Sequence, residues 1–340
     1  MVCGSNPTRL PIKHHQSAPT MPDIAVIILN WNGEKLLGEF LPSVIANTPG
    51  DIATVIVADN GSTDGSLRLL AERFPKVQVL RLDRNYGFAG GYNRAIRATQ
   101  YRYTLLLNSD VMTPPGWLGP LHRWMLEHPE AGAVMPKIRS YLHPEMFEYA
   151  GAAGGYLDRN GYPYCRGRIF NRIERDNGQY DTPATVFWAT GAAMLVDTKA
   201  YLAVGGLDED FFAHMEEIDL CWRLQLAGRT NWVVPQSSVY HLGGASLDAS
   251  NPRKTYLNFR NNLLMLHKNL PDNSRRRTLL RRRLLDTLAW GRFMVTARWR
   301  HANAILRAHR DFRKMRANYT LHPSRDLIAG NPSILRRLFH

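Results

Sequence analysis

The residues best suited to hold an ion in this 340-residue chain are Asp110 and His241. Asp110 follows the apolar run 103–107, which is short for a helix and typical of a buried strand. Open α/β sheets bind ligands at the carboxyl ends of their strands. A carboxylate and an imidazole suit Mn²⁺ or Mg²⁺ when a diphosphate supplies further oxygens. Both residues also have ordinary explanations, because an Asp can cap the next helix and a His before Gly-Gly can be structural.

A second group of candidates is acidic. Glu216, Glu217 and Asp219 place three carboxylates within four residues, at the predicted start of a helix. The helix dipole stabilises anions there, so a well-capped helix is the simplest explanation. Glu216 and Glu217 nevertheless point about 100° apart on a helix. One of them can therefore face a cavity while the other binds elsewhere or caps the turn.

The elements that must position these side chains alternate between strand and helix. Strands are predicted at residues 24–29, 53–58, 77–82 and 103–107, and helices up to about residue 47, at 66–74 and at 92–99. Nearly continuous apolar strands joined by helices predict a doubly wound α/β fold with a mostly parallel sheet. Asn or Asp follows each of these strands. Helix capping can explain one such residue, but it explains four in a row less well.

The second half of the chain is less regular. Residues 136–183 are rich in Gly, Tyr, Arg and Asn and predict a long, partly ordered insertion, suited to acceptor binding. Further strands are predicted at 185–188, 192–196, 232–234 and 238–240, and helices at 216–227 and 253–269. Trp188 can stack against a bound ligand that approaches this insertion, or pack in the core.

The glycine-rich stretch 87–91 precedes a predicted helix, where backbone amides can approach phosphates. It does not follow the first strand and lacks the G-x-G-x-x-G spacing, which disfavours a dinucleotide fold. The sequence also lacks the G-x-x-x-x-G-K-[ST] pattern of a P-loop. Three cysteines without paired or metal-finger spacing make a disulfide framework or a structural zinc site unexpected.

Most of the net charge of +14 lies near the C-terminus. Residues 271–318 carry 14 Lys and Arg against 3 Asp and Glu, a net charge of +11. Arginines alternate there with Leu, Trp and Phe, so we expect residues 271–340 to form a basic amphipathic helical tail that binds a membrane surface. A helix packed on the domain with a solvated charged face is the alternative. Nucleic-acid binding is not expected, because no accompanying motif is present. Residues 1–22 are expected to be a disordered leader.

Seven motifs, in order, resemble those of the family 2 glycosyltransferases, most closely the bacterial rhamnosyltransferase and galactofuranosyltransferase branch. They are the segments 29–33, 59–65, 85–91, 108–110, 205–212, 216–223 and 240–244. The resemblance covers about residues 24–270, and it implies a GT-A fold for a domain spanning residues 23–270. It also implies a nucleotide-diphosphate sugar donor, a divalent metal, Mn or Mg, and inversion at the anomeric carbon.

The resemblance also implies roles for individual residues. Asp110 matches the last acid of the family's Asp-x-Asp metal motif, whose first acid is replaced here by Asn108, and His241 matches a histidine that completes the metal site in some members. Glu217 stands where the family has its catalytic base, usually an Asp, and Glu216 would then face the acceptor. The positions implied to bind the donor are Asn30, Asp59, Arg84, Asn85, Gly90, Ser109 and Asp110.

We therefore expect an inverting glycosyltransferase that adds rhamnose or a related sugar, from a dTDP or UDP donor, to a lipid-linked or polysaccharide acceptor. The expected location is cytoplasmic and peripheral, on the inner face of the cell membrane. Two other classes of protein remain open. A sugar nucleotidyltransferase shares this general sheet but would need a basic phosphate-binding loop after the first strand, where this chain has residues 30–33. The other is a non-catalytic nucleotide-sugar or glycan-binding protein.

Overall fold

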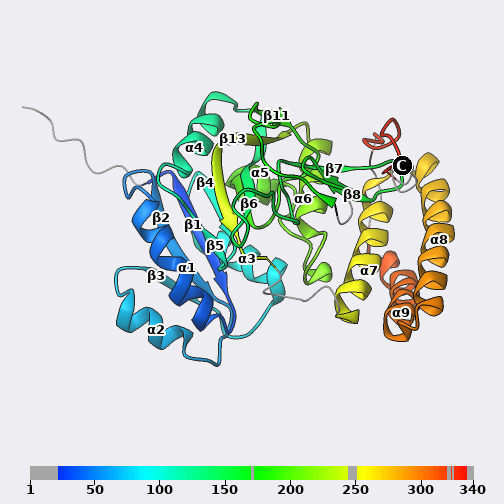
Figure 1. The fold of residues 1–340 in the computed structure, drawn as a ribbon, viewed down its shortest axis with the longest axis horizontal. Coiled ribbons are helices and arrows are strands. Elements are labelled where there is room, and N and C mark those ends of the chain that lie inside the picture. Colours follow the sequence, from blue (N-terminus) through cyan, green and yellow to red (C-terminus); the bar gives the residue numbers. More distant parts are fainter. Residues whose placement is uncertain (1–21, 170–171, 244–250, 320–322, 324, 335–340) are drawn as a thin grey trace, which may run out of the picture.

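A computed structural model describes residues 22–169, 172–243, 251–319, 323 and 325–334 (Figure 1). A nine-stranded sheet runs through the body of the molecule in the order β11-β13-β6-β12-β4-β1-β2-β3, with β5 paired to β13. Its strands are β1 (Ile24–Asn30), β2 (Ala53–Asp59), β3 (Gln78–Arg81), β4 (Tyr103–Leu107), β5 (Val111–Met112), β6 (Ala131–Ser140), β11 (Ala184–Thr185), β12 (Ala193–Asp197) and β13 (Thr230–His241).

The order of the strands gives a mostly parallel half and a mixed half. β4, β1, β2 and β3 are parallel neighbours, β12 is antiparallel to both of its neighbours, and β6 and β13 are parallel. All five residues of β4 are buried, as expected for a strand covered on both faces. The predicted α/β class and mostly parallel sheet are confirmed.

The helices of the body are α1 (Glu34–Asn47), α2 (Ser66–Arg73), α3 (Gly87–Ala98), α4 (Leu118–Glu127), α5 (Thr198–Ala203) and α6 (Glu216–Leu226). Three further helices stand side by side at one end of the molecule (Figure 1): α7 (Pro252–Asn269), α8 (Asp272–Val295) and α9 (Trp299–Met315). Two short 3-10 turns, η1 (Glu209–Phe211) and η2 (Arg316–Asn318), complete the described helices. Within the described ranges, no helix is both long and apolar enough to cross a membrane.

The glycine-rich stretch was wrongly predicted to be a loop. Residues 87–91 form the first turns of α3. Gly91 lies so close to β1 that a Cβ there would be 2.7 Å from a side-chain carbon of Leu29. Glycine is poor in a helix by propensity, but here it allows helix and strand to approach closely. Tertiary packing therefore outweighs the local signal.

Three predictions in the second half of the chain also needed correction. The insertion is more ordered than expected, because it contains the second half of β6 and a small antiparallel sheet of β7 (Gly155–Leu157), β8 (Pro163–Cys165), β9 (Arg168–Ile169) and β10 (Arg172–Ile173). The two strands predicted around residues 232–240 are one strand, β13, whose register shifts between Val233 and Ser238. Pro235, which cannot donate a ladder hydrogen bond, lies at that irregularity. The strand predicted at 185–188 is reduced to β11, followed by an isolated bridge at Trp188.

The first 21 residues, including nearly all of the expected leader, lie outside the described residues.

Candidate functional site

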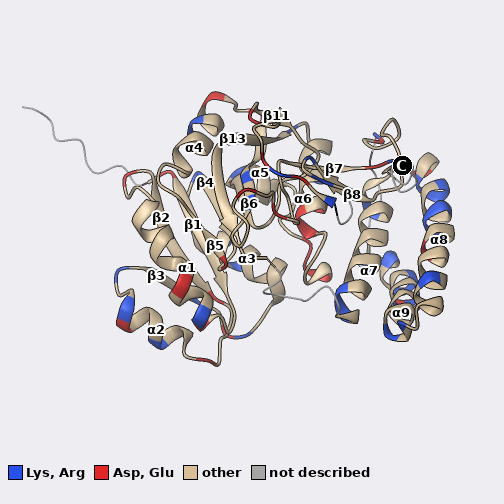
Figure 2. Ribbon diagram, viewed as in Figure 1, with Lys and Arg blue, Asp and Glu red and all other residues tan. Residues whose placement is uncertain are grey.

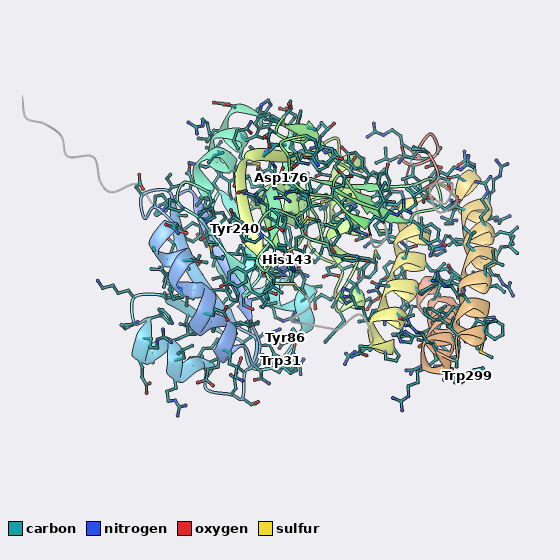
Figure 3. All side chains as sticks on the ribbon, in the orientation of Figure 1. Trp31, Tyr86, His143, Asp176, Tyr240 and Trp299 are labelled. Carbon is teal, nitrogen blue, oxygen red and sulfur yellow. The ribbon has the colours of Figure 1, made fainter. Side chains whose placement is uncertain are left out.

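Asp110 and His241 meet because β13 ends beside β5. His241 pairs with Val111 across these antiparallel strands, and the backbone N–H of Leu242 donates to the carbonyl of Asp110. The two side chains are buried, and Asp110 Oδ1 lies 3.1 Å from His241 Nε2. Tyr240, the residue before His241, marks this region in Figure 3. The structure therefore brings together the two residues that sequence reasoning had assigned to a metal.

A third side chain, which sequence reasoning missed, lies on the other nitrogen of the imidazole. Glu148 Oε2 is 3.4 Å from His241 Nδ1, and Glu148 is also buried. Burial lowers the pKa of His241, but the hydrogen bonds and charges of Asp110 and Glu148 outweigh it and raise the pKa to about 10. Glu148 lies in an irregular segment just after an isolated bridge at Phe147, and no spacing in the sequence links it to His241.

Asp110 and His241 fit a divalent cation in geometry, and they fit it in chemistry once the cation displaces the proton that the raised pKa keeps on the imidazole. Two ligands at about 2.1 Å in octahedral coordination are about 3 Å apart, which agrees with the 3.1 Å between Oδ1 and Nε2. Asn108, whose amide nitrogen is 3.5 Å from the same Nε2, borders this pair. In the part of the chain that the structure describes, no cluster of three His, Cys, Asp or Glu side chains could hold a metal ion. The protein would thus supply a minority of the ligands, and donor oxygens the remainder.

The ends of β1 and β2 form a polar cradle. Asn30 pairs with Asp59 in register, and its side-chain nitrogen donates to Asp59 Oδ1 and Ser62 Oγ, both at 3.1 Å. Asp59 Oδ2 accepts from the backbone N–H of Ser62. Asn30 Oδ1 is buried and has no hydrogen-bond partner among the described residues. The cradle is pre-formed, and Asn30 Oδ1 remains available to accept a hydrogen bond from a ligand such as a base or a sugar.

The remaining predicted donor residues surround the start of α3. Arg84 is exposed, with its guanidinium 4.8 Å from the ring centre of Tyr86. Asn85 uses its side-chain oxygen to accept from Asn60 and from the backbone N–H of Gly87, so it fixes the start of the helix. Gly90 is buried within α3, and Ser109 is half-buried beside Asp110. Trp31, 55% exposed, and Tyr86 are labelled in Figure 3.

Glu217 approaches the same region from α6. A Cβ built on Gly191 would lie 3.9 Å from the Cβ of Glu217 and 3.1 Å from the ring of Phe88, at the start of α3. The next residue, Ala192, accepts a hydrogen bond from the backbone N–H of Asn108. Glu217 is therefore next to the segment that flanks the end of β4 where Asp110 lies.

The two neighbouring glutamates have strongly altered acidity. Burial raises the pKa of Glu217 to about 7, and burial together with the charge of Glu217 raises the pKa of Glu216 well above its usual value. Each has one buried carboxylate oxygen without a hydrogen-bond partner within the described ranges. Carboxyl groups with unused buried oxygens and raised pKa values are typical of proton-transfer sites.

Two other predicted residues have well-defined structural contacts. Trp188 is 4% exposed, donates its Nε1–H to the carbonyl of Tyr156, and covers Gly155 so closely that a Cβ there would overlap the ring. Asp219 is fully buried and contacts Arg223, Lys268 and Asn269 at 2.7 to 3.0 Å. It joins α6 to α7 and leaves no free carboxylate oxygen for chemistry.

The loop before α6 is strained and is held from α7. Phe212, His214 and Met215 have φ angles of +64°, +70° and +73°, which are unfavourable for residues with a side chain. The side-chain nitrogen of Asn261 donates to the carbonyls of Phe211, Ala213 and His214. Strain maintained by such contacts is common at functional sites. No sequence signal singled out Asn261.

The family model described as "Glycosyl transferase family 2" matches residues 25–187. Rhamnosyltransferase WbbL of Escherichia coli is 37% identical over 225 residues, covering 64% of this chain and 83% of that protein. The N-acetylglucosaminyl-diphospho-decaprenol L-rhamnosyltransferase of Mycobacterium tuberculosis is 28% identical over 232 residues, covering 64% of this chain and 75% of that protein.

Solved structures resemble the chain in fold. Staphylococcus aureus TarS 1-349 in complex with UDP-GlcNAc has a TM-score of 0.55 at 18% identity, covering 85% of this chain and 80% of that one. GalNAc-T7 with UDP, GalNAc and Mn²⁺ has a TM-score of 0.58 at 17% identity, covering 73% of this chain but only 48% of that one.

Proposed function

The chain belongs to the family 2 glycosyltransferases, and from that membership we propose that it transfers rhamnose or a related sugar, with inversion, to a lipid-linked or polysaccharide hydroxyl. It has the GT-A fold expected from its motifs and is a glycosyltransferase, which removes the nucleotidyltransferase and non-catalytic alternatives. Two relatives named as rhamnosyltransferases support the choice of sugar, and the diphospho-decaprenol in the name of one supports a lipid-linked acceptor. The donor would be a dTDP or UDP sugar.

The observation that carries the mechanism is the carboxyl group of Glu217. It has a raised pKa, a buried oxygen without a described partner, and a position beside the Asn108 segment. A general base works best when its pKa lies near the working pH. Glu217 would accept the proton of the acceptor hydroxyl as that oxygen attacks the anomeric carbon and the sugar–phosphate bond breaks. Attack opposite the leaving group inverts the configuration.

The donor would lie along the carboxyl ends of the strands. Asn30 and Asp59 would bind the nucleoside in the polar cradle, and Arg84 would place a positive charge beside the diphosphate. Asn85, Gly90 and Ser109 would shape the surface on which the donor lies. When bound, Mn²⁺ or Mg²⁺ held by Asp110 and His241 supplies positive charge to the departing diphosphate.

The acceptor would approach from the side of α6. Glu216 lies one residue from the proposed base and is buried, so it would act on the acceptor through the shape and charge of the cavity wall. Trp188, which is buried, would pack behind that wall and support it without contacting the acceptor. The proposed setting is the cytoplasmic face of the membrane, where lipid-linked precursors are available.

A Glu217→Gln variant tests this function. We expect it to bind the nucleotide-sugar with unchanged affinity and to lose transfer by a factor of about 10² to 10⁴, the usual contribution of a general base. Binding is measured by calorimetry with Mn²⁺ present, and transfer by product analysis with the anomeric configuration assigned by NMR. Transfer at the wild-type rate would refute the assignment of the base, and a retained configuration would refute inversion.

A further inference from the structure

Helix α8 packs on the protein through a face whose most buried side chains are polar. They are Thr278, Arg282 and Asp286, which recur at four-residue intervals and so share one face. The half-buried side chains of Leu279 and Leu285 lie on the same face. A helix on the surface of a globular protein normally turns its apolar residues inward, and α8 departs from this because a second set of its apolar residues faces outward.

Arg282 and Asp286 on the inward face are paired with each other and with neighbouring elements. Arg282 Nη2 is 3.1 Å from Asp286 Oδ1, its Nη1 donates to the carbonyl of Asn160, and its guanidinium lies 4.1 Å from the ring centre of Tyr162. The second oxygen of Asp286 is 3.0 Å from His309 Nε2 on α9. Breaking such a buried, hydrogen-bonded pair is costly. The network therefore fixes which face of α8 points outward.

The outward face carries an exposed apolar stripe. Leu280, Leu284, Leu288 and Val295 are 61%, 63%, 71% and 89% exposed. At about 100° per residue these four side chains fall within about 80° of one another. Trp299, at the start of α9 and labelled in Figure 3, is 56% exposed. Isolated exposed leucines are ordinary, whereas a continuous stripe marks a surface that binds something.

Arginines border this stripe on both sides. On a helical wheel Arg276 and Arg283 fall on one side of the leucines, and Arg281 and Arg292 on the other. Figure 2 shows Lys and Arg concentrated along α8. Within the described ranges, the ion pairs of α8 are Arg275 with Asp272, Arg282 with Asp286 and His309 with Asp286, and none of them involves these four bordering residues.

We propose that the outward face of α8 docks on an anionic lipid surface, with its leucines in the acyl boundary and the bordering arginines on the headgroups. An apolar stripe between rows of cations matches the layered chemistry of an anionic bilayer surface. A second copy of the chain fits less well, because antiparallel pairing of two such faces brings arginines against arginines. The proposal goes beyond sugar transfer and depends on no step of it.

The test is sedimentation of the full chain with phosphatidylglycerol/phosphatidylcholine vesicles and with phosphatidylcholine vesicles. We expect the wild type to bind the anionic vesicles. The variant Leu280→Ser/Leu284→Ser/Leu288→Ser should bind them at least about tenfold more weakly. The control is Ile45→Ser/Leu126→Ser/Leu202→Ser, in which three comparably placed exposed side chains on other helices are changed, and it should bind like the wild type.

A second variant, Arg276→Gln/Arg281→Gln/Arg283→Gln, keeps the stripe and should lose binding to anionic vesicles while retaining its melting temperature. Equal binding by the wild type and the leucine variant would overturn the proposal. The proposal would also be overturned, in favour of a second copy of the chain, by three results together. The wild type would form a dimer by light scattering, the leucine variant would not, and the wild type would not bind vesicles. Each variant is first shown to bind a nucleotide-sugar like the wild type, so failure here is distinct from failure of the proposed function.

Discussion

Oδ1 of Asp110 lies 3.1 Å from Nε2 of His241, although 131 residues separate the two in the chain. The pairing of β13 with β5 creates this contact, and Glu148 holds the opposite nitrogen of the imidazole. A carboxylate on the outer nitrogen of a metal-binding histidine fixes its orientation and raises its basicity. Three segments distant in sequence therefore define one side of the site.

Replacing Glu148 should weaken metal binding without removing a metal ligand. We expect Glu148→Gln to raise the Mn²⁺ concentration for half-maximal binding by roughly 10-fold to 100-fold, the usual effect of losing such a partner. Titration of Mn²⁺ by electron paramagnetic resonance, with a nucleoside diphosphate present, measures it. Glu145→Gln, in the same segment and without a recorded side-chain hydrogen bond among the described residues, is the matched control. An identical Mn²⁺ affinity in both variants would contradict this role.

Transfer should depend on pH through Glu217. Its pKa is raised to about 7, and a base must be deprotonated to act, so kcat/KM should fall about tenfold per unit as the pH drops below 7. The fall should be absent from the residual activity of Glu217→Gln. A wild-type profile that is flat from pH 5 to pH 8 would show that another group accepts the proton.

The same carboxyl group should reduce stability at high pH. Because the pKa of Glu217 rises from 4.5 to about 7 on folding, the folded state binds its proton more tightly, and stability falls as the pH rises between these values. Glu217→Gln should therefore melt about 2 to 4 °C higher at pH 8, a shift that corresponds to about 1 kcal/mol. At pH 4 the two proteins should melt together. Calorimetric scans at both pH values decide the matter, and a variant less stable at pH 8 would contradict it.

Asn261 should position the catalytic helix. Its side-chain amide donates to three carbonyls of the strained loop before Glu217, so Asn261→Ala removes these hydrogen bonds and should cost about 1 to 3 kcal/mol of stability. We expect kcat to fall at saturating donor while donor affinity is retained. Asn258→Ala, one turn earlier on α7, should change neither quantity. Equal loss of kcat in both variants would indicate a general effect on α7.

The role of Trp188 can be determined by measuring stability and acceptor binding separately. Its ring is buried against Gly155, so we expect Trp188→Phe to lower the melting temperature and leave the KM for the acceptor unchanged. Thermal unfolding and acceptor titration on the same preparation measure the two effects. A raised KM with an unchanged melting temperature would instead indicate direct contact with the acceptor.

The sequence predicted the elements whose signal is local. The strands ending at Asn30, Asp59 and Leu107 were found because continuous apolar runs end there in polar residues, and α6 was found from its period and its terminal glycine. Asp110 and His241 were proposed together from their residue types and from the resemblance, and the structure places them in contact.

What the sequence could not predict depends on non-local packing. The first turns of α3 contain glycines because β1 lies against them, and β13 continues through Pro235 because β6 pairs with both of its halves. Glu148 and Asn261 are ordinary polar residues in sequence and gain their significance only from what the fold places beside them. The burial of Arg282 and Asp286 on the inward face of α8 is likewise not predicted by a pattern that assumes only apolar residues face the protein.

The late position of β13 in the chain affects how activity must be acquired. The family model ends at residue 187, before both Glu217 and His241, so a nascent chain can complete β1, β2 and β4 while it still lacks its proposed base and its histidine. Contacts between residues so far apart form slowly, because long loops must close first. Recovery of metal binding during refolding should therefore lag behind recovery of helical structure. Truncation before residue 230 should leave the sheet without His241 and therefore without the proposed metal site.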